Sequence, residues 1–406
     1  MDLLIFTLPN GIRLVHAPVP GMVAHCGLII NAGSRDELRG EHGIAHFIEH
    51  MLFKGTKKRK SYHILSRLED VGGELNAYTT KEDTAIYASF LRDDFERATE
   101  LIADITFNSI YPEKEIKKEK DVVIEEINSY LDTPAELIFD EFEEQIFDGL
   151  PLGRSILGKP DSVKSFSRKK LIDFIARNYC PEQIVFCSVG NIPGDKILKS
   201  FKHHFGQIKP GKKENHKSPV WNYNPSDITR QKDTYQNHCI IGNQAFSIRD
   251  DKRLGMFLLN NILGGQGLNS RLNLALREKN GLAYSVESNY TPYSDSGSLS
   301  IYFGTDKQYL EKSISIVTRE LNKLCSEKLG IIQLSKAKRQ IKGYLARGYE
   351  NHENLMLSLG KSLLTFDKIE TISETYSKID AITSSQLIDI ANEVFDNDGL
   401  STLIYK

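Results

Sequence analysis

The chain has 406 residues, a formal net charge of -2 at pH 7, and 40% hydrophobic and 26% charged residues. This length exceeds what one hydrophobic core comfortably holds and suits two domains of roughly 200 residues each. The weak net charge excludes strong attraction to nucleic acid or anionic lipid, so we expect neither as a partner.

The first half of the chain alternates strand-like and helix-like segments. Strands are expected near residues 3–8, 12–18 and 22–31, followed by helices at 42–54 and 61–71. Gly72 and Gly73 end the second helix. Residues 74–80 and 83–90 then alternate apolar and polar positions like paired strands, and helical periodicity dominates from 93 to about 179. This order predicts an α+β domain.

The second half repeats the order of the first. Residues 208–225 combine Pro, Gly, Lys and Asn without periodicity and mark a linker. After them we expect a strand at 237–246, helices at 250–263 and 269–278, and two further strands. The repetition predicts an internal duplication: a domain at 1–207, a linker at 208–225 and a homologous domain at 226–406.

The cysteines and the amino terminus bear on the compartment. Five cysteines are widely spaced and form no C-x-x-C pair, so we expect free thiols in a reducing environment. The first residues lack a signal-peptide pattern, and no segment approaches the roughly 18 apolar residues that a membrane span needs. We therefore expect a cytoplasmic protein without a membrane partner.

The segment GIAHFIEHMLFKGT carries the strongest chemical signal. His46 and His50 are four residues apart, so on a helix their rings project from one face and can share an ion. Glu49 lies beside that face. This H-x-x-E-H order is an inverted zincin signature, with two histidine ligands and a carboxylate as general base. At an offset of about 208 to 210 the second half has Met256, Leu259 and Asn260 at these places, so only the first half can hold the metal.

A catalytic zinc needs a third protein ligand and an open fourth position. The segment EKDVVIEEINSYL offers Glu119, Glu125 and Glu126. On a helix Glu119 and Glu126 share a face while Glu125 points elsewhere, so Glu126 is the preferred ligand and Glu119 is expected to support the ligand shell. A Glu-rich helix alone is typical of a solvated face, but the two segments together are far more specific.

Together these segments resemble the inverzincin metallopeptidase family of pitrilysin, insulysin and the mitochondrial processing peptidase. The resemblance covers nearly the whole chain. It runs through NAGSRDE at 31–37, HFIEHMLFKGT at 46–56, NAYTTKEDTAIY at 76–87, EKDVVIEEI at 119–127, PLGRSILG at 151–158 and SRLNLALREKNGLAYSV at 270–286.

The resemblance implies two similar α+β domains, each a mixed or antiparallel sheet packed by helices, and one Zn²⁺ per chain. It implies a peptide substrate added as a strand at a sheet edge, which here matches Asn76, Ala77 and Tyr78. It also implies that Arg277 and Tyr284 contact the substrate, with the Tyr284 hydroxyl donating to the developing oxyanion.

In longer family members, the half that binds zinc and the opposite half, which lacks a metal and supplies the Arg and the Tyr, belong to one chain of about twice this length. The resemblance therefore implies a clam-shell homodimer in which Arg277 and Tyr284 of one protomer complete the zinc site of its partner. Two alternatives stay open: a catalytic subunit of an obligate heterodimer, and a non-catalytic scaffold subunit. The expected activity is that of a zinc endopeptidase acting on peptides or unfolded polypeptides.

Overall fold

The computed structural model describes residues 2–213 and 222–406, so part of the predicted linker at 208–225 lies outside the described residues. By its internal contacts the chain divides into two compact units. The first unit takes in Met1–Asn128, Arg154–Ser218 and Arg347–Glu370, and the second takes in Ser129–Gly153, Pro219–Ala346 and Thr371–Lys406. These units differ from the two halves of the sequence because each contains a segment from the other half.

The first unit is built on a six-stranded mixed sheet with the order β1-β2-β6-β3-β5-β4. Only β2 and β6 run parallel. The strands are β1 (Leu4–Thr7), β2 (Arg13–Pro18), β3 (Val23–Ile30), β4 (Glu74–Thr79), β5 (Thr84–Leu91) and β6 (Ile184–Gly190). Among the described strands β4 pairs only with β5, so its other edge is free.

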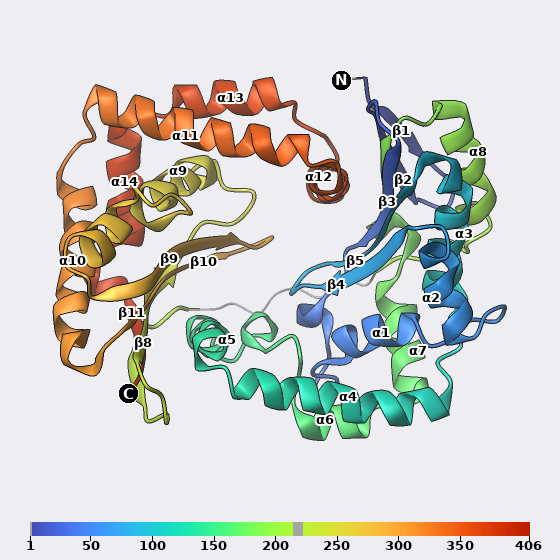
Figure 1. The fold of residues 1–406 in the computed structure, drawn as a ribbon, viewed down its shortest axis with the longest axis horizontal. Helices are drawn as coiled ribbons and strands as arrows, with labels where there is room; N and C mark the ends of the chain where they lie inside the picture. The colour runs from blue at the N-terminus through green and yellow to red at the C-terminus, as the bar shows by residue number, and fades with distance from the viewer. Residues whose placement is uncertain (1, 214–221) are drawn as a thin grey trace. The chain divides into compact units, whose positions relative to one another are not determined.

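Helices cover both faces of this sheet (Figure 1). The larger core lies between one face and helices of the first half, which are α1 (Ile44–Leu52), α2 (Ser61–Glu69), α3 (Phe95–Phe107), α4 (Glu113–Leu131), α6 (Pro160–Ser165), α7 (Arg168–Asn178) and α8 (Gly194–Phe205). The opposite face packs against α12 (His352–Phe366), a helix of the second half. Gly360 permits this packing, because a Cβ there would lie 2.7 Å from Ile29 and 2.9 Å from the Cys187 sulfur.

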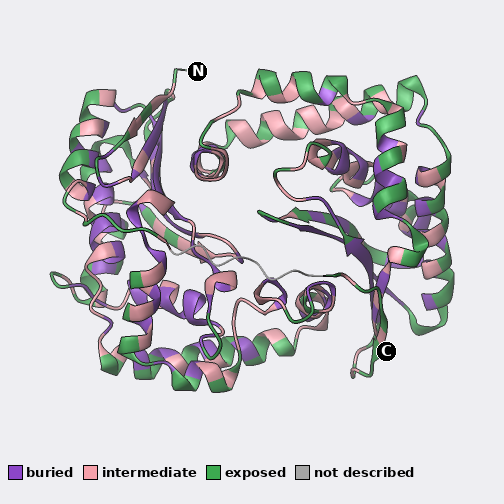
Figure 2. Ribbon diagram, turned by 180° about the vertical axis from the view of Figure 1, so that it is seen from behind, coloured by how far each residue is buried: buried purple, intermediate pink, exposed green. Residues whose placement is uncertain are grey.

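The second unit repeats this design on a five-stranded sheet with the order β7-β11-β8-β10-β9. Its strands are β7 (Asp227–Arg230), β8 (Asn237–Gln244), β9 (Ala283–Pro292), β10 (Gly297–Thr305) and β11 (Ser401–Tyr405). One face packs against α5 (Pro134–Ile146), a helix of the first half. The other packs against α9 (Arg253–Gly264), α10 (Leu310–Ser326) and α14 (Ser384–Val394). The buried residues follow the strands of both sheets, and the helices turn their exposed faces outward (Figure 2).

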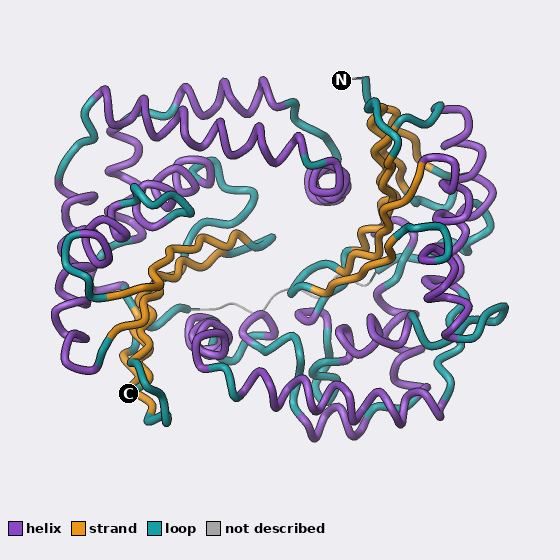
Figure 3. The backbone as a smooth tube through the Cα atoms, in the orientation of Figure 1, coloured by secondary structure: helices purple, strands orange, loops and turns teal. Residues whose placement is uncertain are grey.

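The remaining helices lie at the margin of the second unit. Helices α11 (Ile331–Glu350) and α13 (Ile372–Ala381) run side by side (Figure 3), joined by the ion pair of Lys342 with Asp380 at 2.8 Å. No helix in the described part of the chain combines the length and apolarity that a membrane crossing requires.

The α+β prediction with two similar domains is confirmed, and the strands and helices expected up to residue 90 form within a few residues of their predicted bounds. The second half differs in one detail: the helix expected at 269–278 is a π-helical turn over Asn273–Glu278.

Candidate metal centre

The amino terminus of α1 is fixed by a buried carboxylate. Glu37 accepts hydrogen bonds from the backbone N–H groups of Gly43 (2.9 Å) and Ala45 (3.0 Å), which a helix leaves unpaired at its first turn. Burial raises the pKa of Glu37 to about 8, although these two hydrogen bonds favour the charged form. Gly43 has φ +91°, and a Cβ there would meet the Leu157 carbonyl oxygen at 2.5 Å, so only glycine fits. The helix that carries the histidines therefore starts at a defined position.

Three potential ligands converge where α1 meets α4. One ligand atom from each of His46, His50 and Glu126 lies within 4.8 Å of the others. The Glu126 carboxylate is 3.7 Å from His46 Nε2 and 3.5 Å from His50 Nε2. Ligands held about 2.0–2.2 Å from a tetrahedral zinc lie roughly 3.3–3.6 Å from one another. Both distances therefore fit a zinc ion with little rearrangement.

The surroundings of His50 also fit a metal. His50 Nδ1 donates to Glu119 Oε1 at 2.9 Å, and because a carboxylate can only accept, the proton of this bond sits on Nδ1. Nε2, which faces Glu126, is then the ring nitrogen that can bind a metal once it is deprotonated. The two rings meet edge to face at 4.6 Å between centroids. Within the described residues, the buried Nδ1 of His46 has no hydrogen-bond partner.

The protonation of the two histidines differs. Burial, and then the charge of His50, lowers the pKa of His46 to about 4, so this ring is neutral at pH 7, the form that binds metals. Burial alone would lower the pKa of His50, but the hydrogen bond to Glu119 and the neighbouring carboxylates outweigh it and raise that pKa. Burial works to raise the pKa of Glu119, and its bonds to His50 and Lys54 outweigh burial and lower it.

Glu49 is half-buried beside the two histidines. Its Oε2 accepts a hydrogen bond from the Thr79 hydroxyl at 2.6 Å. Burial raises the pKa of Glu49, against the hydrogen bond from Thr79 and the charge of His50, which lower it. A carboxylate with a raised pKa, close to a group of metal-binding side chains, suits the exchange of protons with a reacting water.

Two residues at this centre were not anticipated as functional. Lys54, which as part of a basic loop would be solvated, instead contacts Glu119 Oε2 at 2.7 Å and completes a chain from His50 through Glu119. Its position just after the end of α1, four residues from His50, was the available signal. Thr79 gave no comparable signal, because the sequence does not say which of two adjacent threonines faces α1.

The predicted substrate residues fall in two places. Asn76, Ala77 and Tyr78 lie on β4, one of the two edge strands of the sheet in the first unit. Arg277 and Tyr284 lie together in the second unit, where the guanidinium stacks on the ring at 4.9 Å and the Tyr284 side chain is 77% exposed. The catalytic, ligand and substrate-binding roles of these residues stay predictions.

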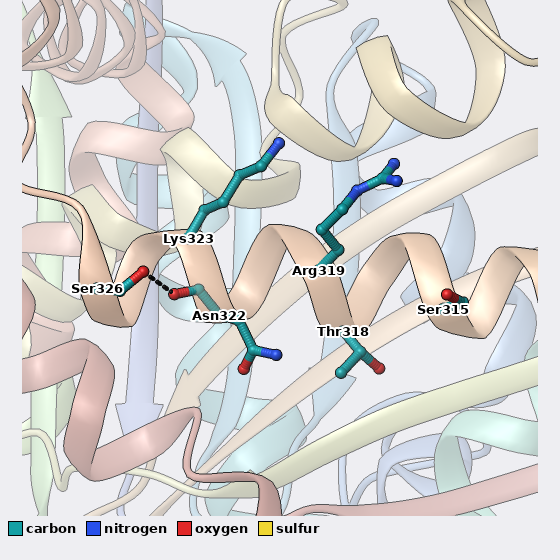
Figure 4. Close-up of a pocket in the computed structure, with 6 residues that line it drawn as sticks. All are labelled: Ser315, Thr318, Arg319, Asn322, Lys323 and Ser326. Carbon is teal, nitrogen blue, oxygen red and sulfur yellow. Dashed lines mark hydrogen bonds between the residues drawn. The ribbon is translucent and has the colours of Figure 1, made fainter.

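A depression on the surface of the second unit lies along the polar face of α10 (Figure 4). Its lining comes from this one helix and comprises Ser315, Thr318, Arg319, Asn322, Lys323 and Ser326. Ser326 donates to the Asn322 carbonyl at 2.7 Å, a bond within the helix. The depression brings together no pair of groups suited to catalysis.

The geometry defines a class of metal centre: an H-x-x-E-H helix whose two imidazoles meet a carboxylate from a following helix, in the first of two related α+β units. The sequence comparisons agree with it. The family description "Insulinase (Peptidase family M16)" matches residues 15–160, and "Peptidase M16 inactive domain" matches residues 165–341. The chain belongs to this insulinase family of peptidases, as the resemblance implied.

Relatives of similar length exist in several bacteria. An "Uncharacterized zinc protease" of Bacillus subtilis is 34% identical over 402 residues, covering 98% of this chain and 97% of the relative. Another "Uncharacterized zinc protease", from Rickettsia bellii, is 34% identical over 399 residues, covering 98% of this chain and 96% of the relative.

Solved structures share the fold. A protease from Helicobacter pylori superimposes with a TM-score of 0.92 at 22% identity, covering 100% of this chain and 99% of that one. A structure from Pseudomonas fluorescens, described as a peptidase M16 inactive domain, gives a TM-score of 0.92 at 18% identity, with 100% and 98% covered.

Proposed function

We propose that this protein is a zinc-dependent endopeptidase that hydrolyses peptides or unfolded polypeptides. The observation that carries the proposal is the meeting of His46, His50 and Glu126 within 4.8 Å, beside the half-buried carboxylate of Glu49. It is supported by relatives of nearly equal length that are named zinc proteases. Among the described residues this is the one cluster suited to a metal, which supports one Zn²⁺ per chain.

A zinc ion held by these three residues would supply a Lewis acid to a water molecule and to the scissile carbonyl. In this proposal Glu49 removes a proton from the attacking water and later delivers it to the leaving amide nitrogen. Glu119 and Lys54 keep the His50 ring oriented, since Glu119 holds the Nδ1 proton and Lys54 holds Glu119.

The free edge of β4 is the proposed docking place of the substrate. A peptide that adds there as a strand would hydrogen-bond to the backbone over Asn76, Ala77 and Tyr78. Main-chain pairing carries little side-chain selectivity, so the proposal includes broad specificity for extended chains.

We further propose that the working form is a homodimer in which the partner's Arg277 and Tyr284 complete each zinc site. The exposed Tyr284 ring, stacked under Arg277, supports a contact surface for a substrate or a partner. A cytoplasmic location is supported by five free cysteines, four of them buried.

The test is digestion of a mixed, unfolded peptide library by the purified protein. We expect cleavage that a chelator stops and that added zinc restores. Zinc bound at one ion per chain without cleavage of any library member, even at high enzyme concentration, would instead favour the scaffold alternative.

A further inference from the structure

Thr79 connects two parts of the proposed site that are far apart in sequence. It is the last residue of β4, and its hydroxyl donates to Glu49 Oε2 at 2.6 Å. Glu49 therefore receives this hydrogen bond from an edge strand of the sheet.

The alternation of β4 explains why Thr79 reaches Glu49. Side chains two residues apart on a strand share a face. Leu75 and Ala77 pack into the core that contains α1, whereas Tyr78 packs into the core on the α12 side. Thr79 belongs to the α1 face. It is β-branched and thus restricted at χ1, so its hydroxyl is held in place by a stiff side chain.

The backbone of Thr79 lies in the sheet on one side only, and it also contributes a backbone hydrogen bond to Glu49. It pairs with Thr84 of β5, and β4 has no described partner on its other edge. A peptide added at that edge would pair with the backbone of β4 and restrain it further. Restraint of the backbone extends to the hydroxyl through the stiff χ1.

We propose that Thr79 is a positioning residue that aims the general base Glu49, and that it couples occupation of the β4 edge to the orientation of that base. The inference rests on the proposed peptidase function. It follows that Thr79 affects the rate at which the bound peptide is cleaved and does not affect metal binding. Peptides long enough to pair along β4 should gain more in kcat from the Thr79 hydroxyl than short peptides do.

The test compares Thr79→Val, which keeps the shape and removes the hydroxyl, with Thr79→Ser, which keeps the hydroxyl. Thr106→Val is the matched control, because its buried hydroxyl donates at 2.7 Å only to the Ile102 carbonyl of its own helix. For a long peptide we expect Thr79→Val to lower kcat by roughly 10- to 100-fold, the size of effect that a misplaced catalytic group produces. KM and zinc content should stay near wild type, Thr79→Ser should recover most of kcat, and Thr106→Val should keep it.

Crystal structures of the same variants separate this inference from the proposed function. We expect the Glu49 carboxylate to keep its position in Thr79→Ser and to leave it in Thr79→Val, whether or not the wild type cleaves peptides. An unchanged Glu49 in Thr79→Val, or a wild-type kcat in that variant, would overturn the role of Thr79. A wild type that cleaves nothing while Glu49 moves as expected would count against the peptidase function alone.

Discussion

Lys54 and Glu119 form an ion pair behind His50, and this pair orders one ligand of the metal centre from outside. The Glu119 side chain is only 5% exposed and is bonded to Lys54 Nζ at 2.7 Å. Without that partner the carboxylate would lose part of the interaction that offsets its burial. The hydrogen bond from His50 Nδ1 to Glu119, which orients the ring, would then weaken as well.

Replacing Lys54 by Met should therefore weaken zinc binding. We expect a loss of roughly 10- to 100-fold in zinc affinity, the range seen when groups that orient ligands are removed. Competition with a chromophoric chelator measures this affinity. Lys57→Met, at an exposed position of the same loop, is the control and should bind zinc like the wild type. Equal affinities in the two variants would show that Lys54 does not order the centre.

For individual residues, the sequence predicted those site positions that follow from helix periodicity. The positions of His46, His50 and Glu126 follow from spacing along two helices, because residues four or seven apart share a face. The contacts of Thr79 and Glu37 depend on how a strand and a loop pack against α1. Such contacts are tertiary and leave no periodic trace in the sequence.

Helix α12 is the element whose place was least predictable. Its apolar face marks it as buried, but nothing in its pattern says that it packs on the sheet of the first unit. Polar contacts hold it there: Lys361 pairs with Asp83 at 3.0 Å, and the Ser89 hydroxyl donates to Glu353 at 2.8 Å. The strand β6 likewise lies between β2 and β3, far from both in sequence. Local patterns predict elements, and long-range pairing decides their neighbours.

The close approach of α12 to the sheet gives a stability prediction. Gly360→Ala places a Cβ against Ile29 and Cys187, and overpacking of this kind costs roughly 1–3 kcal/mol in the free energy of unfolding. Gly343→Ala, in α11, meets no atom within 4 Å and should instead stabilise by up to about 1 kcal/mol through helix propensity. Thermal denaturation should move the two variants in opposite directions. A Gly360→Ala variant as stable as Gly343→Ala would mean that α12 does not sit this close to the sheet.

For the whole molecule, the sequence showed the duplication as a repeated order of elements. It did not show that α5, from the first half, packs in the second unit, or that α12, from the second half, packs in the first. The two units share a plan because each needs a helix on both faces of its sheet to bury its strands. The sequence marks where elements begin and end. It does not mark which half supplies the covering helix.

The proposed homodimer predicts complementation between two inactive variants. Glu49→Gln removes the base and Arg277→Ala removes the residue supplied by the partner. Mixing them under conditions that exchange subunits should restore about a quarter of wild-type activity, because half of the dimers are mixed and each holds one intact site. Peptide cleavage before and after exchange measures the recovery.

The control mixes Glu49→Gln with Glu126→Gln, two changes in the same zinc site, which should restore nothing. Failure of the first mixture to recover activity, with exchange verified by native mass spectrometry, would place Arg277 outside the partner's site. Activity of a single protomer would contradict the dimer directly.

In the proposed mechanism Glu49 works as the base beside a zinc held by His46, His50 and Glu126. The most direct test measures zinc content and peptide turnover together in the wild type and in Glu49→Gln. We expect both proteins to bind one zinc per chain and Glu49→Gln to lose at least about 100-fold in kcat. Turnover near the wild-type rate in zinc-loaded Glu49→Gln would contradict the account.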